Sequence, residues 1–180
     1  MTLAIVEADR SHHEALDLDE LQLEQFKHDE IYHREIARLT TQDRLKHMAL
    51  HFAKYAGNLA EHSDEAAIRK AVTDTFVIAV STANILNVQL SKALKSEQGS
   101  GADDRSFGQI LTIYAGKMAA ACEKLDHLED FPFRPVIRDS ALALLQAATN
   151  EASRRGWDIT SLTRDRLAGV KQKMIFHGRV

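Results

Sequence analysis

Hydrophobic residues recur along this chain at the spacing of amphipathic helices, and they divide it into six predicted helices. The first spans residues 18–39, and its apolar positions are Leu18, Leu21, Phe26, Ile31, Ile36 and Leu39. The second runs from residue 41 to about residue 62, after Thr40, a predicted N-cap with Asp43 three residues further on. Its apolar residues fall on one face and predict a buried stripe: Leu45, Met48, Phe52, Ala56 and Leu59.

The third predicted helix is apolar nearly all round between Val72 and Leu86, which is typical of a central, buried helix. Ser63 is its expected N-cap, and acidic residues follow in the first turn, where the helix dipole favours them. The amphipathic pattern continues beyond Asn87 to about Lys95, so we expect one long helix here.

Three further helices are predicted, over 107–127, from 136 to a stop at Gly156, and from about 160 towards 176. Ser106 is the expected N-cap of the first of these. Residues 97–105 have the composition of a flexible linker, and both prolines fall between residues 131 and 135. The breaks in the pattern therefore coincide with glycine, proline and small polar residues.

Composition supports a purely helical fold. The 180 residues include only 8 Gly and 2 Pro, whereas average usage would give roughly 22 such residues. Sheet proteins need many turns, and turns use Gly and Pro. We therefore predict an all-α helical bundle, with one domain over 18–180 after a flexible N-terminal arm at 1–17.

A weak internal repeat refines this prediction; the alternative is chance, because Ala-rich helices resemble one another easily. The segment Tyr55-Ala-Gly-Asn-Leu-Ala-Glu61 resembles Tyr114-Ala-Gly-Lys-Met-Ala-Ala120, and each is followed by a polar loop, an Ile-Arg pair and a long Ala-rich helix. The repeat predicts two similar helix hairpins, at about 41–96 and 106–157. They would pack about a pseudo-twofold axis as an internal pseudo-dimer, giving a four-helix core flanked by the first and last helices.

Charge and cysteine content narrow the function classes. The net charge is −3, which argues against nucleic-acid binding. Residues 1–30 hold nine acidic and two basic residues, whereas residues 164–180 hold five basic and one acidic. A single cysteine suits a reducing compartment. There is no secretory pattern at the N-terminus and no apolar run near the ~18 residues of a membrane span, so we expect a cytoplasmic protein that is not membrane-bound.

Asp74 is the first candidate for chemistry, because it lies within the most apolar predicted helix. A buried charge is unfavourable unless it is paired, hydrogen-bonded or bound to a metal. Asp74 could therefore mark a site, or it could face a polar seam and pair with a nearby Lys or Arg. The repeat aligns it with Ala143, so only the first hairpin carries the carboxylate.

The second predicted helix offers a polar face of four residues, which are His47, His51, Lys54 and Asn58. Two histidines four residues apart can bind one metal, and a lysine one turn later can contact a phosphate. The alternative is a solvated face opposite the apolar stripe. His28 and His33 could enlarge the patch, and Lys173 belongs to a basic C-terminal segment that could bind phosphates or be a simple basic tail.

The segment His51-Phe-Ala-Lys-Tyr-Ala-Gly-Asn-Leu-Ala-Glu61, followed by Ile68-Arg-Lys-Ala-Val-Thr-Asp74, resembles the core of the MazG-like all-α nucleoside triphosphate pyrophosphatases. In that family one helix carries Glu-Glu-x-x-Glu, commonly followed by Leu-Ala-Glu, and the next carries Glu-x-x-Asp. The resemblance implies an all-α fold whose carboxylates hold Mg²⁺. The metal would activate water to cut a nucleotide between its α and β phosphates.

The match to this family is incomplete at the metal motif. The chain keeps Gly57, the Leu-Ala-Glu ending at Glu61, and Asp74. The other carboxylate positions of the family are occupied here by Lys54, Tyr55, Asn58 and Ala71. Asp74 and Glu61 are therefore the metal ligands that the resemblance leaves, and an ordinary Mg²⁺ cluster cannot form from them alone.

These observations support three hypotheses. In the first, the chain is a divergent MazG-like nucleotide-binding protein or pyrophosphohydrolase with a pocket between the second and third helices. Its catalytic residues would be Asp74 and His51, with substrate bound by His47, Lys54, Asn58 and Lys173. In the second, it is a non-catalytic scaffold or regulator, with an exposed apolar patch and no polar pocket, that binds a protein partner. In the third, it is a His/Asp metal protein; a homodimer is compatible with all three.

Overall fold

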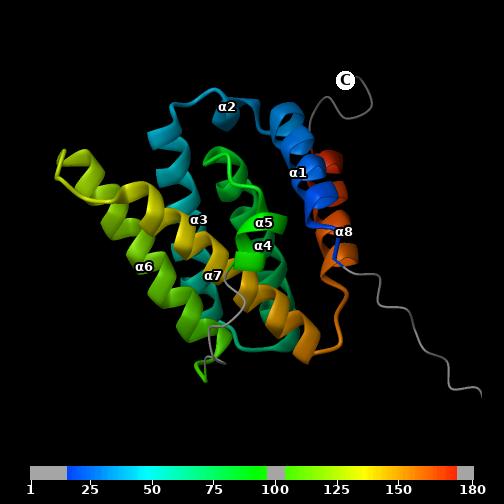
Figure 1. The fold of residues 1–180 in the computed structure, drawn as a ribbon. Helices are drawn as coiled ribbons and strands as arrows, with labels where there is room; N and C mark the ends of the chain where they lie inside the picture. Colours follow the sequence, from blue (N-terminus) through cyan, green and yellow to red (C-terminus); the bar gives the residue numbers. More distant parts are fainter. Residues whose placement is uncertain (1–15, 97–103, 174–180) are drawn as a thin grey trace, which may run out of the picture.

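The computed structural model describes residues 16–96 and 104–173 as a bundle of helices (Figure 1), and no strand occurs in these two ranges. This confirms the predicted all-α fold. The helices are α1 (Leu18–Tyr32), α2 (Arg34–Ala37), α3 (Thr41–Glu61), α4 (Glu65–Ile85), α5 (Leu90–Ser96), α6 (Phe107–Asp126), α7 (Phe133–Arg154) and α8 (Ile159–Lys173). Residues 1–15 of the predicted arm at 1–17, residues 97–103 of the predicted linker at 97–105 and the predicted helix end near residue 176 lie outside these ranges.

Four long helices form the core. α3 packs against α4 and α6, and α7 packs against the same two helices, so the hairpins α3–α4 and α6–α7 face each other. Fully buried side chains from all four helices meet between them, among them Phe52, Phe76, Met118 and Leu144. α1 and α8 lie side by side and both pack against α4, on the side of the bundle away from α6 (Figure 1). The predicted four-helix core with flanking first and last helices is therefore present.

Helix starts follow the predicted capping pattern with one change. The Thr40 hydroxyl accepts the backbone N–H of Asp43, and Ser106 forms a capping box with Gln109. The predicted cap at Ser63 is wrong by one residue. The carboxylate of Asp64 instead accepts the backbone N–H of Ala67 at 3.0 Å, because α4 begins only at Glu65.

Two predicted helices are interrupted. The predicted third helix ends at Ile85, because Asn87 adopts a left-handed backbone with φ 52°. The N–H groups of Asn87 and Val88 bond back to the carbonyls of Asn84 and Ala83, which is a Schellman C-cap, and asparagine tolerates this conformation. The predicted helix at 18–39 is broken at His33, whose φ of −128° and ψ of 42° separate α1 from α2.

The buried face of α1 differs from its predicted apolar stripe. Phe26 is 49% exposed and Ile31 is 42% exposed, although both were expected to point inward. Leu21, Gln25 and His28 are buried instead. These three residues follow helical spacing, so α1 has an inward face that is mainly polar. This face borders a cavity.

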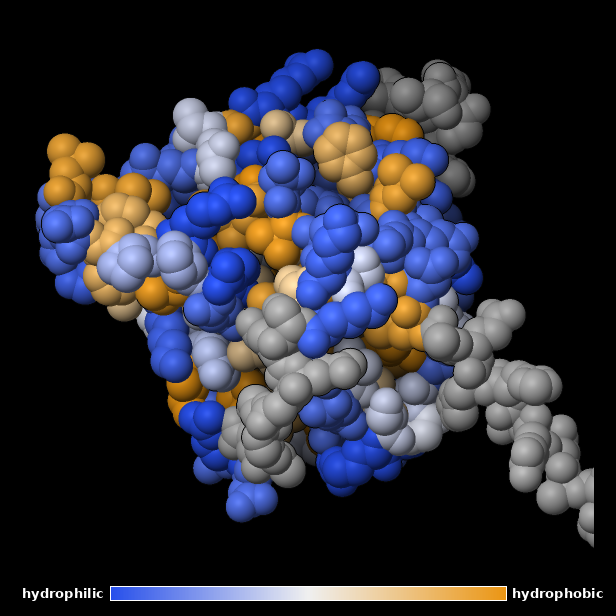
Figure 2. Space-filling view, in the orientation of Figure 1, coloured by the Kyte–Doolittle hydropathy of each residue, from blue (hydrophilic) through white to orange (hydrophobic). Residues whose placement is uncertain are grey.

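The surface view in Figure 2 is largely hydrophilic, with apolar atoms gathered at the tip of the α6–α7 hairpin on its left. Six large hydrophobic side chains are exposed among the described residues: Leu23, Phe26, Ile31, Leu39, Leu50 and Leu128. Over the part of the chain that the structure covers, no helix combines the length and apolar character needed to cross a membrane.

Candidate functional site

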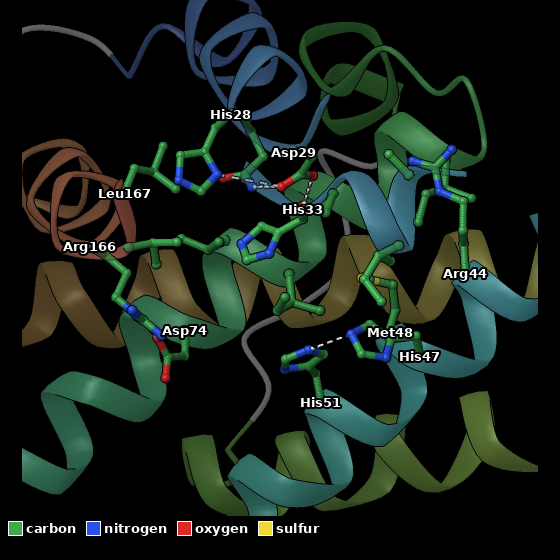
Figure 3. A pocket seen from close by; sticks show the side chains of 18 of the residues that line it. His28, Asp29, His33, Arg44, His47, Met48, His51, Asp74, Arg166 and Leu167 are labelled. Carbon is green, nitrogen blue, oxygen red and sulfur yellow. Dashed lines mark hydrogen bonds and ion pairs between the residues drawn. The ribbon is translucent and has the colours of Figure 1, made fainter. Parts of the chain in front are cut away.

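A cavity of about 130 Å³ lies between α1, α2, α3, α4 and α8 and is partly open to solvent. The cavity has an unusual concentration of polar groups for the interior of a helical bundle (Figure 3). Its polar lining residues are Gln25, His28, Asp29, His33, Arg44, His47, His51, Tyr55, Asp74, Ser81 and Arg166. The remaining wall is aliphatic, with Met48, Ile78 and Leu167 among its members.

His47 and His51 form a close pair on α3. Their Nε2 atoms are 3.0 Å apart, and the rings meet edge to face. Nδ1 of His51 lies 2.9 Å from the hydroxyl of Tyr55 and 3.3 Å from Nζ of Lys54. An ammonium group can only donate, so Nδ1 of His51 is an acceptor and its Nε2–H donates to His47. The pair is thus a fixed relay of neutral imidazoles.

Burial keeps this pair neutral at pH 7. Desolvation, together with the nearby Lys54 cation, lowers the pKa of His51 to about 4. The same two causes lower the pKa of His47. Neutral imidazoles can coordinate a metal or accept a proton, but these two carry no charge with which to attract an anion.

Asp74 faces the cavity from α4 and is only 2% exposed. Its Oδ1 accepts the Nε–H of Arg166 at 2.5 Å, and its Oδ2 accepts a hydrogen bond from Lys70, one turn earlier on α4. Of the two interpretations of Asp74 from sequence, the structure shows the pairing with Lys and Arg. Because each oxygen already contacts a cation, Asp74 is a structural anchor that ties α8 to α4.

The other predicted site residues do not converge on this cavity. Lys54 is exposed and approaches His51 from outside the cavity lining. Asn58 and Glu61 are exposed nearer the end of α3, and Lys173 is exposed at the end of α8. The predicted metal pair of Asp74 and Glu61 is therefore not brought together, because the cavity lies beside the first half of α3 rather than its last turn.

The structure adds a cluster that sequence reasoning had treated only as part of a histidine patch. His28, Asp29 and His33 offer ligand atoms that all lie within 4.8 Å of one another. His28 is 3% exposed, and neither of its ring nitrogens has a hydrogen-bond partner among the described residues. Leaving a buried polar group unsatisfied costs about 1–3 kcal/mol. The buried face of α1, with His28 seven residues after Leu21, was the signal that could have found it.

Two arginines line the cavity on different sides (Figure 3). Arg166 lies near Asp74, and Arg44 lies beyond His47. Nε of Arg44 is buried and has no hydrogen-bond partner within the described part of the chain. A buried guanidinium N–H without a partner is a donor available to an anionic ligand. Sequence reasoning missed both arginines, because neither lies in a recognisable motif.

A comparison of this chain with known protein families, with curated proteins and with solved structures finds no match.

Proposed function

We propose that this chain is a divergent MazG-like protein that binds the phosphate end of a nucleotide, or of a similar phosphorylated small molecule, in the cavity between α1, α3, α4 and α8. The observation that carries the proposal is Arg44, whose buried Nε has no hydrogen-bond partner among the described residues and which lines a concave cavity with several polar groups in an otherwise aliphatic wall. Guanidinium groups are the preferred protein partners of phosphate, because their fork of donors matches its oxygens.

The dimensions of the cavity decide how such a ligand would bind. A volume of about 130 Å³ is close to that of an engineered cavity that holds one benzene molecule. A phosphate group fits this space, whereas a whole nucleotide does not. The phosphate end would enter beside Arg44, and the base and sugar would remain at the open side of the cavity.

Hydrolysis would need a metal together with the ligand. A divalent metal can be held by one or two protein carboxylates together with the substrate phosphates, as Mg²⁺ usually is. Asp29 is the cavity carboxylate best placed for this, because its oxygens accept hydrogen bonds from the neutral groups of Gln25 and Ser81. Asp74 is engaged by two cations. The proposed activity is therefore pyrophosphohydrolysis by a site reorganised relative to the MazG-like motif.

A non-catalytic scaffold is the second candidate, and one observation favours it. Leu23 and Phe26 are about half exposed on the outward side of α1, as an apolar docking surface would be. The same hypothesis expects no polar concave pocket, and the cavity beneath α1 is such a pocket. The geometry therefore favours ligand binding over partner docking.

The test is ligand binding to the purified full chain, measured by calorimetry and thermal shift after treatment with chelator. The ligands are inorganic phosphate, pyrophosphate and a panel of nucleoside mono-, di- and triphosphates, each repeated with Mg²⁺ and Mn²⁺ while product is assayed. We expect Arg44→Gln to weaken binding about tenfold or more, since one charge-assisted hydrogen bond is worth about 1.5–3 kcal/mol. Arg38→Gln, an exposed arginine outside the cavity lining, is the matched control.

No turnover combined with no thermal shift by any ligand would reject the proposal and leave the scaffold hypothesis. Equal binding by the Arg44 and Arg38 variants would also reject it, because the ligand would then lie elsewhere. Binding without turnover would retain the binding function and remove the hydrolytic one.

A further inference from the structure

We propose that the junction of α1 and α2 is a binding site for one divalent transition-metal ion of the Zn²⁺ class, with His28, Asp29 and His33 as its protein ligands. None of these residues belongs to the carboxylate motif that the sequence resemblance implies. The proposal deepens the proposed function, because the metal would lie in the same cavity, but the metal site stands on its own observations.

The three side chains offer ligand atoms near enough for one metal ion to bind all of them after a side-chain movement. One ring nitrogen of each histidine and one carboxylate oxygen of Asp29 lie within 4.8 Å of one another. A tetrahedral metal at about 2.0–2.1 Å from each ligand holds its ligands about 3.4 Å apart. The ligand atoms therefore need to approach one another by up to about 1.4 Å, and we assign this movement to the ring of His33, which is the more exposed of the two imidazoles.

The ring nitrogens of His28 provide a second, independent observation in favour of a metal ion. Its side chain is buried and faces the cavity, yet both ring nitrogens lack hydrogen-bond partners in the described chain. The carboxylate of Asp29 lies 3.7 Å from Nδ1 of His28, which is too far for a hydrogen bond. Buried polar atoms are nearly always satisfied, and a metal ion satisfies an imidazole nitrogen directly.

Asp29 is held in the orientation that a ligand needs. Gln25 donates to its Oδ1 at 2.8 Å, and Ser81 on α4 donates to its Oδ2 at 2.7 Å. Each carboxylate oxygen has two lone pairs, so one hydrogen bond at each leaves room for a metal bond. Hydrogen bonds of this kind to a ligating carboxylate commonly orient metal sites. The two donors therefore act as supports from two different helices.

The break between α1 and α2 explains how His33 joins the other two residues. In an uninterrupted helix, side chains five residues apart point about 140° from each other around the axis. At His33 the backbone leaves helical geometry, and the rings of His28 and His33 come to 5.4 Å between centroids. The cavity requires this break, which the apolar pattern of residues 18–39 does not predict.

Ligand chemistry selects the class of metal. Two imidazoles and one carboxylate suit Zn²⁺, Fe²⁺ or Co²⁺, whereas Mg²⁺ prefers oxygen ligands and waters. Three protein ligands also leave coordination positions open towards the cavity, as in catalytic rather than structural zinc sites. Figure 3 shows His33 between the His28–Asp29 pair and the His47–His51 pair, so the open positions face the space proposed for phosphate.

The experiment uses the full chain without an affinity tag, stripped with chelator and then titrated with Zn²⁺ or Co²⁺ in the absence of any phosphate. We expect one ion per chain, a visible Co²⁺ spectrum of nitrogen and oxygen coordination, and no competition from Mg²⁺. Asp29→Asn and His33→Gln should each weaken binding about tenfold or more. His62→Gln, at an exposed histidine outside the cavity lining, should not change it.

Circular dichroism of each variant separates loss of binding from loss of folding, and both substituted side chains are at least partly exposed. Absence of stoichiometric Zn²⁺ and Co²⁺ binding would overturn the proposal. So would binding that is lost in His47→Gln but kept in His33→Gln, because the metal would then belong to the α3 pair. Phosphate binding through Arg44 is measured on metal-free protein, so either proposal can fail while the other stands.

Discussion

The two hairpins of the core have similar sequences but different neighbours. The first, α3–α4, is covered by α1 and α8, and the cavity lies at that contact. The second, α6–α7, aligns Ile110 with His51 and Ala143 with Asp74. The polar residues that the core helices contribute to the cavity therefore come from the first hairpin only, and α1, the α1–α2 junction and α8 supply the others. Both hairpins contribute buried side chains to the core, whereas the candidate site lies only at the covered one.

The largest expected effect concerns the buried core positions at which the two hairpins align. Phe76 and its aligned counterpart Leu145 are both almost fully buried. Replacing either by alanine leaves a cavity in the same core, so we expect each variant to lose about 2–5 kcal/mol of unfolding free energy. Urea denaturation measures both. A large loss for one variant and almost none for the other would show that the hairpins do not share a single core.

The next largest expected effect concerns the ion pair between Asp74 of the first hairpin and Arg166 of α8. Arg166→Met removes the cation that bonds Asp74 across the α4–α8 contact and leaves a buried carboxylate with Lys70 alone. Removing one partner of a buried pair costs about 3–5 kcal/mol, and the partial exposure of Arg166 places the expected loss towards the low end. Arg164→Met, which removes an exposed arginine paired with Glu20 and Glu24, should lose much less, because exposed ion pairs contribute little to stability.

The double variant Asp74→Ala/Arg166→Met completes that test. Its Asp74→Ala change copies the second hairpin, which has Ala143 at this position, and removes the buried carboxylate from the α4–α8 contact. We expect it to be more stable than Arg166→Met alone. If the double variant is the less stable of the two, Asp74 stabilises the fold through contacts other than this ion pair.

Hydrophobic periodicity predicted the four core helices because their buried stripes are apolar, and the caps at Thr40 and Ser106 followed from their local sequence. It failed at α1, where the buried residues Gln25 and His28 are polar and the apolar Phe26 points outward. From sequence alone, a polar helix face is predicted to be exposed to solvent. Only the tertiary structure shows that another element covers it. The helix break at His33 was missed for a related reason, since no glycine or proline marks it.

The candidate site was predictable only in part. Asp74, His47 and His51 do line one cavity, as the helical spacing of the two histidines and the burial of the aspartate suggested. Arg166 was not foreseen, because its contact with Asp74 joins residues that are 92 positions apart. Lys54 and Glu61 were predicted to lie in the site but are exposed outside the cavity lining. They lie on the same helix as His47 and His51, but neighbouring helices do not cover α3 equally along its whole length.

A smaller effect concerns pH. The pKa of His51 is about 4 in the folded protein, below its ordinary value of 6.5, because burial and Lys54 disfavour the cation. The unfolded chain therefore binds more protons between pH 6.5 and 4, and the stability from keeping His51 neutral is lost as pH falls through this range. His51→Ile copies the second hairpin and removes this group. We expect its unfolding free energy to fall less between pH 7 and pH 5, by urea denaturation, than that of the unaltered chain.

The smallest effect compares one aligned tyrosine with the other. Tyr55 is buried and its hydroxyl bonds Nδ1 of His51 at 2.9 Å, whereas Tyr114 is half-buried and its ring contacts Lys117. Tyr55→Phe should lose about 0.5–1.5 kcal/mol for the missing hydrogen bond, and Tyr114→Phe should stay within about 0.5 kcal/mol. Tyr55→Phe should also alter the relay, because Nδ1 of His51 keeps only Lys54 as a partner, and NMR of the His51 ring nitrogens measures this. Equal stabilities and an unchanged ring spectrum would mean that the hydroxyl of Tyr55 does not fix the imidazole pair, and the difference between the hairpins would then reduce to their charged groups.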